Sequence, residues 1–380
     1  MTLLVNKGYK FRIYPNKTQC ESIAKIFGCY RFVYNRFLSK AKTDYETTGK
    51  SNSAFDNQKE LTLLKKDPDF AWLKESDSQA LNQSIVDLKC AYDRFFKKLG
   101  GYPKFKKKTN NQSYTTCVTG SQLQIVNNKI YIPKVGWVKI KQHRPVTGRV
   151  TAGTISKTAS GKYFVALHCK DCPVEKLNEM HCEIGIDLGL NSLIITNEGT
   201  KISNPKRIKK YLDNIEKEQK KLSKKVKGSS NYNKQRVKLA KLHEKVANQR
   251  KDFTHKLTHQ LIKNHDFIAA EDLSVKSMLE NDLEGLSTKQ VKSFHRNISD
   301  VSWSELIRQL EYKSSWYGRK FVQVDRYFPS SQLCSCCNFK NTEVKDLKIR
   351  KWVCPQCGST HDRDHNAAKN ILLEAKRIVT

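Results

Sequence analysis

The sequence predicts an α+β chain of several domains, in which an antiparallel β-unit with a helical insert precedes a second α/β region that contains a metal-binding module. Three observations lead to this prediction. Helical and alternating hydrophobic periods follow one another along the chain. Its 380 residues exceed what a single hydrophobic core usually serves. Five of its 12 cysteines lie between residues 334 and 357.

Residues 15–100 have mostly the pattern of amphipathic helices. Aromatic and aliphatic side chains recur every three or four residues between positions 23 and 37, and again between positions 81 and 96. Thr18-x-x-Glu21 has the form of a capping box at the start of the first helix. Stripes of this kind usually form a helix core, so we assign them a packing role.

The hydrophobic period changes to two from about residue 113 to residue 170, as in half-buried strands. Asn127-Asn128 and Ser160-Gly161 lie between the apolar runs as turn residues. Because residues 9–14 alternate in the same way, we expect one β-barrel from residues 1–14 and 110–178. Residues 15–109 would then be inserted into it.

The charge of the chain points to a nucleic acid partner. Lys and Arg number 70 against 37 Asp and Glu, a formal net charge of +33. Residues 201–250 carry 17 Lys or Arg and 4 Asp or Glu, on what looks like a helical pair broken near Gly228. A charge run is often only a solvated face, but this excess favours a track for phosphates. No apolar run reaches the ~18 residues of a membrane span, and no secretory signal is present, so we expect a cytoplasmic protein without a membrane partner.

A second basic segment alternates cations with aromatic rings. It contains Lys104, Phe105, Lys106 and Lys107. Such a loop can hold phosphates and stack on bases, although a merely solvated basic loop is an equal alternative.

Two C-x-x-C elements separated by 16 residues predict a four-thiolate zinc ribbon. The expected ligands are Cys334, Cys337, Cys354 and Cys357. Each knuckle brings two sulfurs to one side, and four protein ligands leave no coordination position open for catalysis. We therefore expect one structural Zn²⁺. Cys336 could exchange with a neighbouring ligand, and His361 is a further substitute.

Three acidic residues stand where buried elements end or begin. Asp187 and Glu271 each follow an apolar strand, and Asp364 opens the last helix. Mg²⁺ and Mn²⁺ prefer carboxylate oxygens, and two such ions ~4 Å apart can activate water and stabilise a leaving oxygen. Each acid alone could be a cap or turn residue, but the set predicts a metal site. Residues 185–189 also resemble the phosphate turn of actin-like ATPases, yet neither a second phosphate loop nor a Walker-type loop follows.

Several motifs in a fixed order resemble the TnpB (OrfB) family. They are Tyr9-Lys10-Phe11-Arg12-Ile13-Tyr14-Pro15, Tyr102-Pro103-Lys104-Phe105-Lys106, Gly185-Ile186-Asp187-Leu188-Gly189, Ala270-Glu271-Asp272-Leu273, Phe328-Pro329-Ser330-Ser331 before the cysteines, and Asp362-Arg363-Asp364-His365-Asn366-Ala367-Ala368. The likeness runs the whole chain. Gln332 stands where this family usually has Lys, and Asn338 where it commonly has Gly, so both departures bear on the geometry of the ribbon.

The resemblance implies an RNA-guided DNA endonuclease of an insertion sequence, similar to the compact type V CRISPR effectors. It implies an amino-terminal wedge barrel with a helical recognition insert, followed by a RuvC-type nuclease domain of RNase H fold at residues 181–325 and 361–380. The zinc ribbon at residues 326–360 would interrupt that domain.

The site residues implied by the resemblance are the Mg²⁺ ligands Asp187, Glu271 and Asp364. Asp364 is preferred to Asp362 because the family acid lies two residues before Asn366. Arg296 and Arg326 match positions that family members often hold basic, where they would touch nucleic acid.

The implied partners are a guide RNA from the element's own end and double-stranded target DNA beside a short flanking motif. Two alternatives remain beside the enzyme. One is a zinc-bearing regulator that binds without cutting, as in relatives that have lost the acids, and the other is a transposase that joins DNA without RNA. The sequence does not give the oligomeric state.

Overall fold

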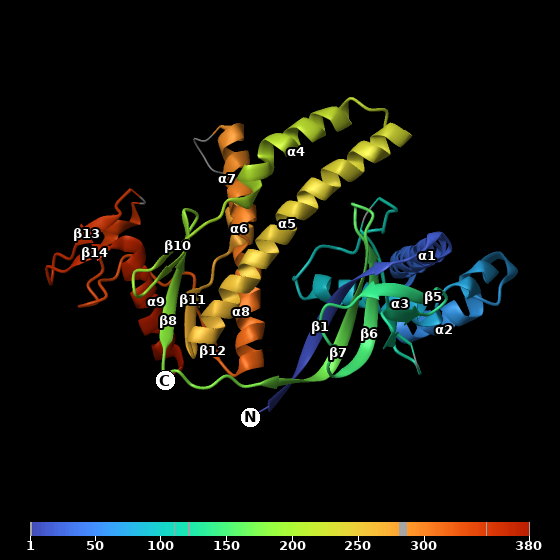
Figure 1. Ribbon diagram of the computed structural model, residues 1–380, viewed down its shortest axis with the longest axis horizontal. Helices are drawn as coiled ribbons and strands as arrows, with labels where there is room; N and C mark the ends of the chain where they lie inside the picture. Colours follow the sequence, from blue (N-terminus) through green and yellow to red (C-terminus); the bar gives the residue numbers. More distant parts are fainter. Residues whose placement is uncertain (1, 110, 121, 281–286, 347, 380) are drawn as a thin grey trace. The chain divides into compact units, whose positions relative to one another are not determined.

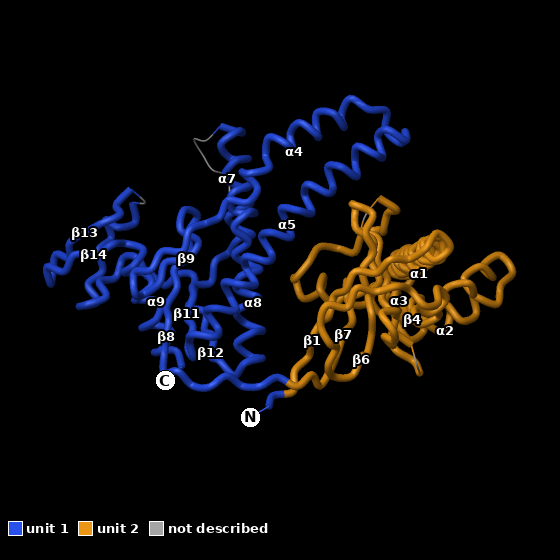
Figure 2. Tube along the Cα trace, in the orientation of Figure 1, with its two compact units in different colours: residues 1–3, 174–380 blue, residues 4–173 orange. Residues whose placement is uncertain are grey.

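The computed structural model describes residues 2–109, 111–120, 122–280, 287–346 and 348–379. The chain divides into two compact units, residues 4–173 and residues 1–3 with 174–380 (Figure 2). Each unit has its own sheet and its own hydrophobic core. Within the described ranges, no helix has the length and apolar character that crossing a membrane requires.

The first unit contains one seven-stranded sheet, in the order β2-β6-β7-β1-β5-β4-β3. They are β1 (Thr2–Tyr14), β2 (Gln112–Cys117), β3 (Ile125–Val126), β4 (Lys129–Ile132), β5 (Gly136–Lys141), β6 (Arg149–Lys157) and β7 (Tyr163–Glu175). The first strand of the chain lies between β7 and β5, so it joins strands more than 100 residues away. The β3–β4 hairpin turns at Asn127 and Asn128, with φ values of 47° and 57°, as a type I′ turn requires.

The helices between β1 and β2 are α1 (Lys17–Thr48), α2 (Ala54–Leu64), a 3₁₀ segment (Pro68–Glu75) and α3 (Ser78–Phe96), as seen in Figure 1. Ile23, Ile26 and Phe27 on α1 share a core with the strands. The next turns of α1, from Val33 to Leu38, pack against α2 and α3 in a second core. The apolar stripe predicted on this helix therefore has a packing role, first against the sheet and then, further along α1, against α2 and α3.

The predicted capping box at Thr18 and Glu21 is wrong. Asn16 is the N-cap of α1: its side chain accepts from the Gln19 backbone N–H at 2.8 Å, and the Gln19 side chain accepts from the Asn16 N–H at 3.0 Å. Thr18 already lies inside the helix, where its carbonyl accepts from Ser22. Asn caps a helix at least as well as Thr, and Pro15 keeps the preceding backbone extended, so the helix begins two residues earlier.

The sheet of the second unit has five strands in the order β10-β9-β8-β11-β12. They are β8 (Glu183–Leu188), β9 (Ser192–Thr196), β10 (Lys201–Ser203), β11 (Phe267–Glu271) and β12 (Lys320–Val324). β8, β9 and β10 run antiparallel in succession, whereas β11 is parallel to both β8 and β12. The two central strands, β8 and β11, are thus parallel neighbours whose carboxyl ends meet at one edge.

Helices cover both faces of this sheet. The helices of the second unit are α4 (Arg207–Ser223), α5 (Ser230–Asn264), α6 (Val275–Glu280), α7 (Thr288–Val301), α8 (Trp303–Tyr317) and α9 (Arg363–Val379). Of these, α5 to α8 share a core with one face of the sheet and α9 with the other, while α4 packs against α5. Ile268 and Ala270 share a core with α5, α7 and α8, whereas Phe267 and Ala269 share one with Ile371 and Ala375 of α9. Because side chains alternate along a strand, odd-numbered residues of β11 face α9. The same alternation places Ile184 and Ile186 of β8 against α5 and α8.

A small module lies between β12 and α9 along the chain. It contains a 3₁₀ turn (Thr342–Lys345) and the antiparallel hairpin of β13 (Lys351–Val353) and β14 (Thr360–Asp362). Its core holds Cys334, Cys354, Val344 and Trp352. So small a core cannot hold a module together by burial alone, which suits a metal-bound fold.

Candidate active site and metal centre

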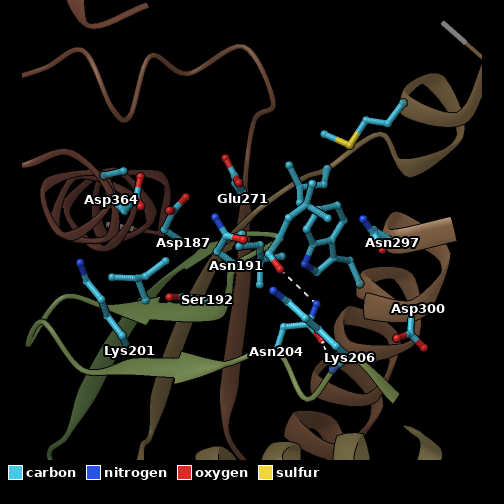
Figure 3. A pocket seen from close by; sticks show the side chains of 18 of the residues that line it. Asp187, Asn191, Ser192, Lys201, Asn204, Lys206, Glu271, Asn297, Asp300 and Asp364 are labelled. Atoms are coloured by element: carbon cyan, nitrogen blue, oxygen red, sulfur yellow. Dashed lines mark hydrogen bonds between the residues drawn. The ribbon is translucent and has the colours of Figure 1, made fainter. Parts of the chain in front are cut away.

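The three predicted acids meet at the carboxyl ends of β8 and β11. Ile186 pairs with Ala270 in the parallel register, so Asp187 and Glu271 are the next residues on neighbouring strands. Both positions face α9 by strand alternation. Asp364, in the first turn of α9, faces them (Figure 3).

Gly185 explains how closely α9 approaches β8. A Cβ at this position would lie 2.2 Å from the Ala368 carbonyl oxygen and 2.8 Å from the Leu372 Cβ. Asp364 and Ala368 are one helical turn apart on α9, and Gly185 and Asp187 are two residues apart on β8. Residues spaced in these ways share a face of their element. Contact between helix and strand at Gly185 therefore brings Asp364 beside Asp187.

The acids lie in a pocket of about 960 Å³ whose lining carries charges of both signs, because Asp300 and Asp362 line it too. Its basic lining residues are Lys201, Lys206, Lys209, Arg296, Arg350 and Arg363. Carboxylates can bind divalent metal ions, and cations that line the same pocket can bind a polyanion.

Burial raises the pKa of two of the acids, and at Asp187 the neighbouring carboxylates raise it further. The pKa of Asp187 is raised well above its ordinary range, first by burial and then by the charges of Glu271 and Asp364. Burial also raises the pKa of Glu271 to about 7, although a hydrogen bond from the Leu188 backbone N–H opposes the shift. Carboxyls forced together in this way are typical of functional sites, where cations take the place of the protons.

Asp362 lines the same pocket, but both of its carboxylate oxygens already have partners. Its Oδ2 accepts from Lys201 Nζ at 2.8 Å, and its Oδ1 accepts from the His365 backbone N–H at 3.1 Å. Burial alone would raise the pKa of Asp362, but these hydrogen bonds and the Lys201 charge hold it below its usual value. Asp362 thus acts as a cap of α9. The neighbouring Asp364 faces Asp187, with Arg350 Nη1 3.5 Å from its Oδ1.

The four predicted cysteines form one cluster that could hold a metal ion, with all sulfurs within 4.8 Å of one another. The Cys334–Cys357 and Cys337–Cys354 sulfur pairs are both separated by 3.6 Å. Four sulfurs bonded tetrahedrally at about 2.3 Å would lie about 3.8 Å apart, so the cluster fits a zinc ion closely. Hydrogen bonds from Ser359 lower the pKa of Cys357 to about 6, whereas at Cys337 a backbone hydrogen bond from Phe339 is outweighed by burial and the neighbouring cysteines, which raise the pKa of that thiol to about 12.

The two knuckles have matching backbone turns. Asn338 follows the second cysteine of the first knuckle with φ 62°, and Gly358 follows that of the second knuckle with φ 71°. Asn338 and Gly358 donate backbone hydrogen bonds to the carbonyls of Cys334 and Cys354, both at 2.9 Å. Asn tolerates the left-handed region better than most residues, so it can replace Gly here without loss of the turn.

The residues predicted to touch nucleic acid fall in two places. Arg296, on α7, lines the pocket that holds the three acids, and Arg326 pairs with Asp272 at 2.6 Å beside Glu271. The basic loop that contains Lys104, Phe105, Lys106 and Lys107 belongs to the first unit.

Lys106 differs from its neighbours in that loop. Its ammonium group lies 4.7 Å from the Tyr30 ring centre and 4.2 Å from that of Tyr34. Asn35 accepts from the Lys106 backbone N–H at 2.7 Å and donates to its carbonyl at 2.9 Å. Burial lowers the pKa of Lys106. Lys106 therefore fastens the loop to α1, while Lys104, Phe105 and Lys107 are exposed.

Arg350 and the role of two asparagines were not predicted from the sequence. Arg350 stands in a basic run within a chain of high positive charge, so no signal separates it from its neighbours. Asn366 bonds the Ser335 N–H and the Leu333 carbonyl, and Asn370 donates to the Leu333 carbonyl at 2.7 Å. These amides share one face of α9 and fasten the ribbon to it. Their spacing of four was the available signal.

Comparison with known proteins places the chain among insertion-sequence proteins. A family model described as "Probable transposase" (OrfB_IS605) matches residues 167–282, and the "Cas12f1-like, TNB domain" model matches residues 303–371. A "Helix-turn-helix domain" model matches residues 1–50, where the structure has β1 and α1.

Curated relatives match over nearly the whole length. A Streptomyces pristinaespiralis protein named "Putative RNA-guided DNA endonuclease" is 34% identical over 97% of this chain and 89% of its own. The Escherichia coli K12 protein "Putative RNA-guided DNA endonuclease InsQ" is 32% identical over 96% of this chain and 91% of its own. A solved Cas12f1 structure has 13% identity and a TM-score of 0.58 over 97% of this chain and 98% of that chain, a likeness of fold alone.

The mixed α/β architecture, with its four-cysteine cluster, is thus that of the compact proteins related to type V effectors. Within this class, the chain belongs to the TnpB (OrfB) family.

Proposed function

We propose that this protein is an RNA-guided DNA endonuclease that hydrolyses phosphodiester bonds at the Asp187, Glu271 and Asp364 site. The convergence of these three carboxylates in one pocket that basic residues also line is the observation that carries the proposal. The names of the curated relatives support the same class of activity.

The fold of the second unit supports a RuvC-type nuclease domain at residues 181–325 and 361–380. Counted within its own sheet, the strand order is 3-2-1-4-5, with antiparallel pairing among the first three strands and parallel pairing after them. This is the arrangement of an RNase H-type fold. We further propose that residues 326–360 are its zinc ribbon, and that residues 1–14 and 110–178 form a wedge barrel around a recognition insert at 15–109.

The carboxylates of Asp187, Glu271 and Asp364 would hold the Mg²⁺ ions, whose chemistry is to activate water and stabilise the leaving oxygen. The Lys and Arg side chains that line the pocket would hold the backbone phosphates beside the Mg²⁺ ions. Guide RNA pairing would supply target specificity, with the protein reading a short flanking motif. Arg296 and Arg326, together with the exposed Lys104, Phe105 and Lys107, are the proposed nucleic acid contacts.

The test is cleavage of a supercoiled target by the protein purified with its RNA. Asp187→Asn, Glu271→Gln and Asp364→Asn remove charge at constant size, so each variant should bind the target and fail to cut. Asp362→Asn is the matched control, because its partners are Lys201 and a backbone N–H, and it should still cut.

Other outcomes would identify the alternatives. A wild-type protein that binds its RNA-specified target and never cuts would be a regulator. Cutting or joining that needs no RNA would favour a transposase. An inactive Asp362→Asn variant beside an active Asp364→Asn variant would show that the third acid is misassigned.

A further inference from the structure

The ribbon carries two further soft ligands beside its four-cysteine cluster. The Cys336 Sγ and a ring nitrogen of His361 lie within 4.8 Å of each other and of the Cys334 Sγ. Cys336 is exposed, and His361 is only 7% exposed. Cys334 therefore belongs to two groups of ligand atoms at once.

Local structure fixes the imidazole beside the Cys334 sulfur. His361 pairs with Trp352 across the β13–β14 hairpin, and the two rings are 4.7 Å apart. His361 Nε2 lies 3.1 Å from Cys334 Sγ. On a shared ion with bonds of about 2.3 Å to sulfur and about 2.0 Å to nitrogen, a tetrahedral angle would place these atoms about 3.5 Å apart. The ring would have to move by only a few tenths of an ångström.

A hydrogen bond from His361 to the Cys334 sulfur would explain this short contact without a second ion. It would not account for Cys336, whose side-chain sulfur completes the group, while its backbone N–H donates to Cys334 Sγ at 3.4 Å. Two thiolates and one imidazole form a ligand set that selects thiophilic cations and disfavours hard ones such as Mg²⁺. The ligand chemistry thus separates this site from the carboxylate pocket.

We propose that Cys334, Cys336 and His361 form a second site for a thiophilic divalent cation of the Zn²⁺ class, with the Cys334 thiolate bridging it to the ion in the four-cysteine cluster. Water completes the fourth position, because Cys336 opens to solvent. Three protein ligands, one of them shared, hold an ion more weakly than four thiolates do. The second ion therefore binds only after the first, at higher free metal. The proposal is independent of nuclease activity.

The experiment counts zinc on the full-length protein. Zinc-loaded protein in excess Mg²⁺, which occupies the carboxylate pocket, is titrated with Zn²⁺, and the ions retained per chain are measured by native mass spectrometry. Wild type should rise from one ion to two. A parallel titration with Cd²⁺ should add sulfur-to-metal absorbance in the ultraviolet at the second step.

Three variants separate the site from its alternatives. Cys336→Ser and His361→Gln should both stay at one ion, although Gln can still donate a hydrogen bond to the Cys334 sulfur. Cys90→Ser removes an exposed thiol outside the ribbon and should still reach two ions. Saturation of wild type at one ion, or a second ion that survives Cys336→Ser, would overturn the proposal.

Discussion

Replacing Gly185 with alanine is expected to push α9 away from β8. The new Cβ would lie 2.2 Å from the Ala368 carbonyl oxygen, a backbone atom that cannot rotate aside, whereas heavy-atom contacts settle near 3.5 Å. α9 must therefore shift by about 1 Å, and overpacking of this kind costs about 1–3 kcal/mol. Since Asp364 moves with α9 and Asp187 stays on β8, the carboxylates separate. A displacement of about 1 Å can slow a reaction about 100-fold.

Single-turnover cleavage and denaturant unfolding on the same preparations would measure both effects. Gly28→Ala on α1 is the matched control, because its nearest contact would be Arg31 Nη2 at 4.0 Å. Alanine stabilises a helix interior by up to about 1 kcal/mol relative to glycine, so this control should be at least as stable as wild type and cut equally fast. A Gly185→Ala protein with wild-type stability and rate would refute the close-packing argument. Lower stability with an unchanged rate would show that the site does not depend on this contact.

Three further predictions concern the carboxylates, the ribbon and the basic loop. Because burial raises the pKa of Glu271 from 4.5 to about 7, the metal-free folded state binds more protons than the unfolded state in this range, and stability is lost as pH rises through 7. Glu271→Gln should flatten that part of the stability–pH curve, and Mg²⁺ should restore wild-type stability at pH 8; a curve that Glu271→Gln leaves unchanged would contradict the assignment. Cys354→Ser should lose about one zinc per chain by metal analysis and expose the ribbon to proteases, since structural zinc supplies about 10 kcal/mol or more of folding free energy; a zinc-loaded, protease-resistant variant would count against it. Lys106→Ala should lower stability by about 1 kcal/mol through lost cation–π contacts, whereas Lys107→Ala should spare stability and reduce the salt dependence of nucleic acid binding by about one phosphate contact; identical behaviour of the two variants would show that they do not differ in role.

The features predicted correctly from sequence depend on short-range patterns. The β8, β9, β11 and β12 strands follow from runs of apolar residues, and the Asn127-Asn128 turn follows from the residue types that accept positive φ. Asp187, Glu271 and Asp364 were singled out because they flank such runs. Strand alternation puts Asp187 and Glu271 on the face of the sheet that packs against α9. Asp364 lies in the first turn of that helix.

The features that the sequence did not reveal depend on single side-chain partners far along the chain. Asp362 and Asp364 are alike by position, and what separates them includes the contact of Asp362 with Lys201, 161 residues away. Lys106 resembles its basic neighbours until α1 places two rings beneath its ammonium group. Arg350 likewise gains its place through the ribbon hairpin. The local sequence does not reveal such long-range pairs, because any Lys or Arg in a basic segment fits the local pattern of charges equally well.

The burial and close spacing of the three carboxylates, which suit them to bind cations, also destabilise the folded state. Desolvation and repulsion both raise the pKa of Asp187, and nearby Arg363 only partly offsets them. The first turn of α9 favours a negative charge at Asp364, and Arg350 lies within 4 Å of it, yet an arginine 61% exposed gives little free energy in water. The remaining repulsion between the carboxylates acts to separate β8, β11 and α9, the elements that carry them. At Gly185, β8 and α9 are so close that a Cβ would not fit. If the proposed cations bind at these carboxylates, an ion that neutralises the acids would also hold α9 against the strands, so that cation binding would stabilise this packing.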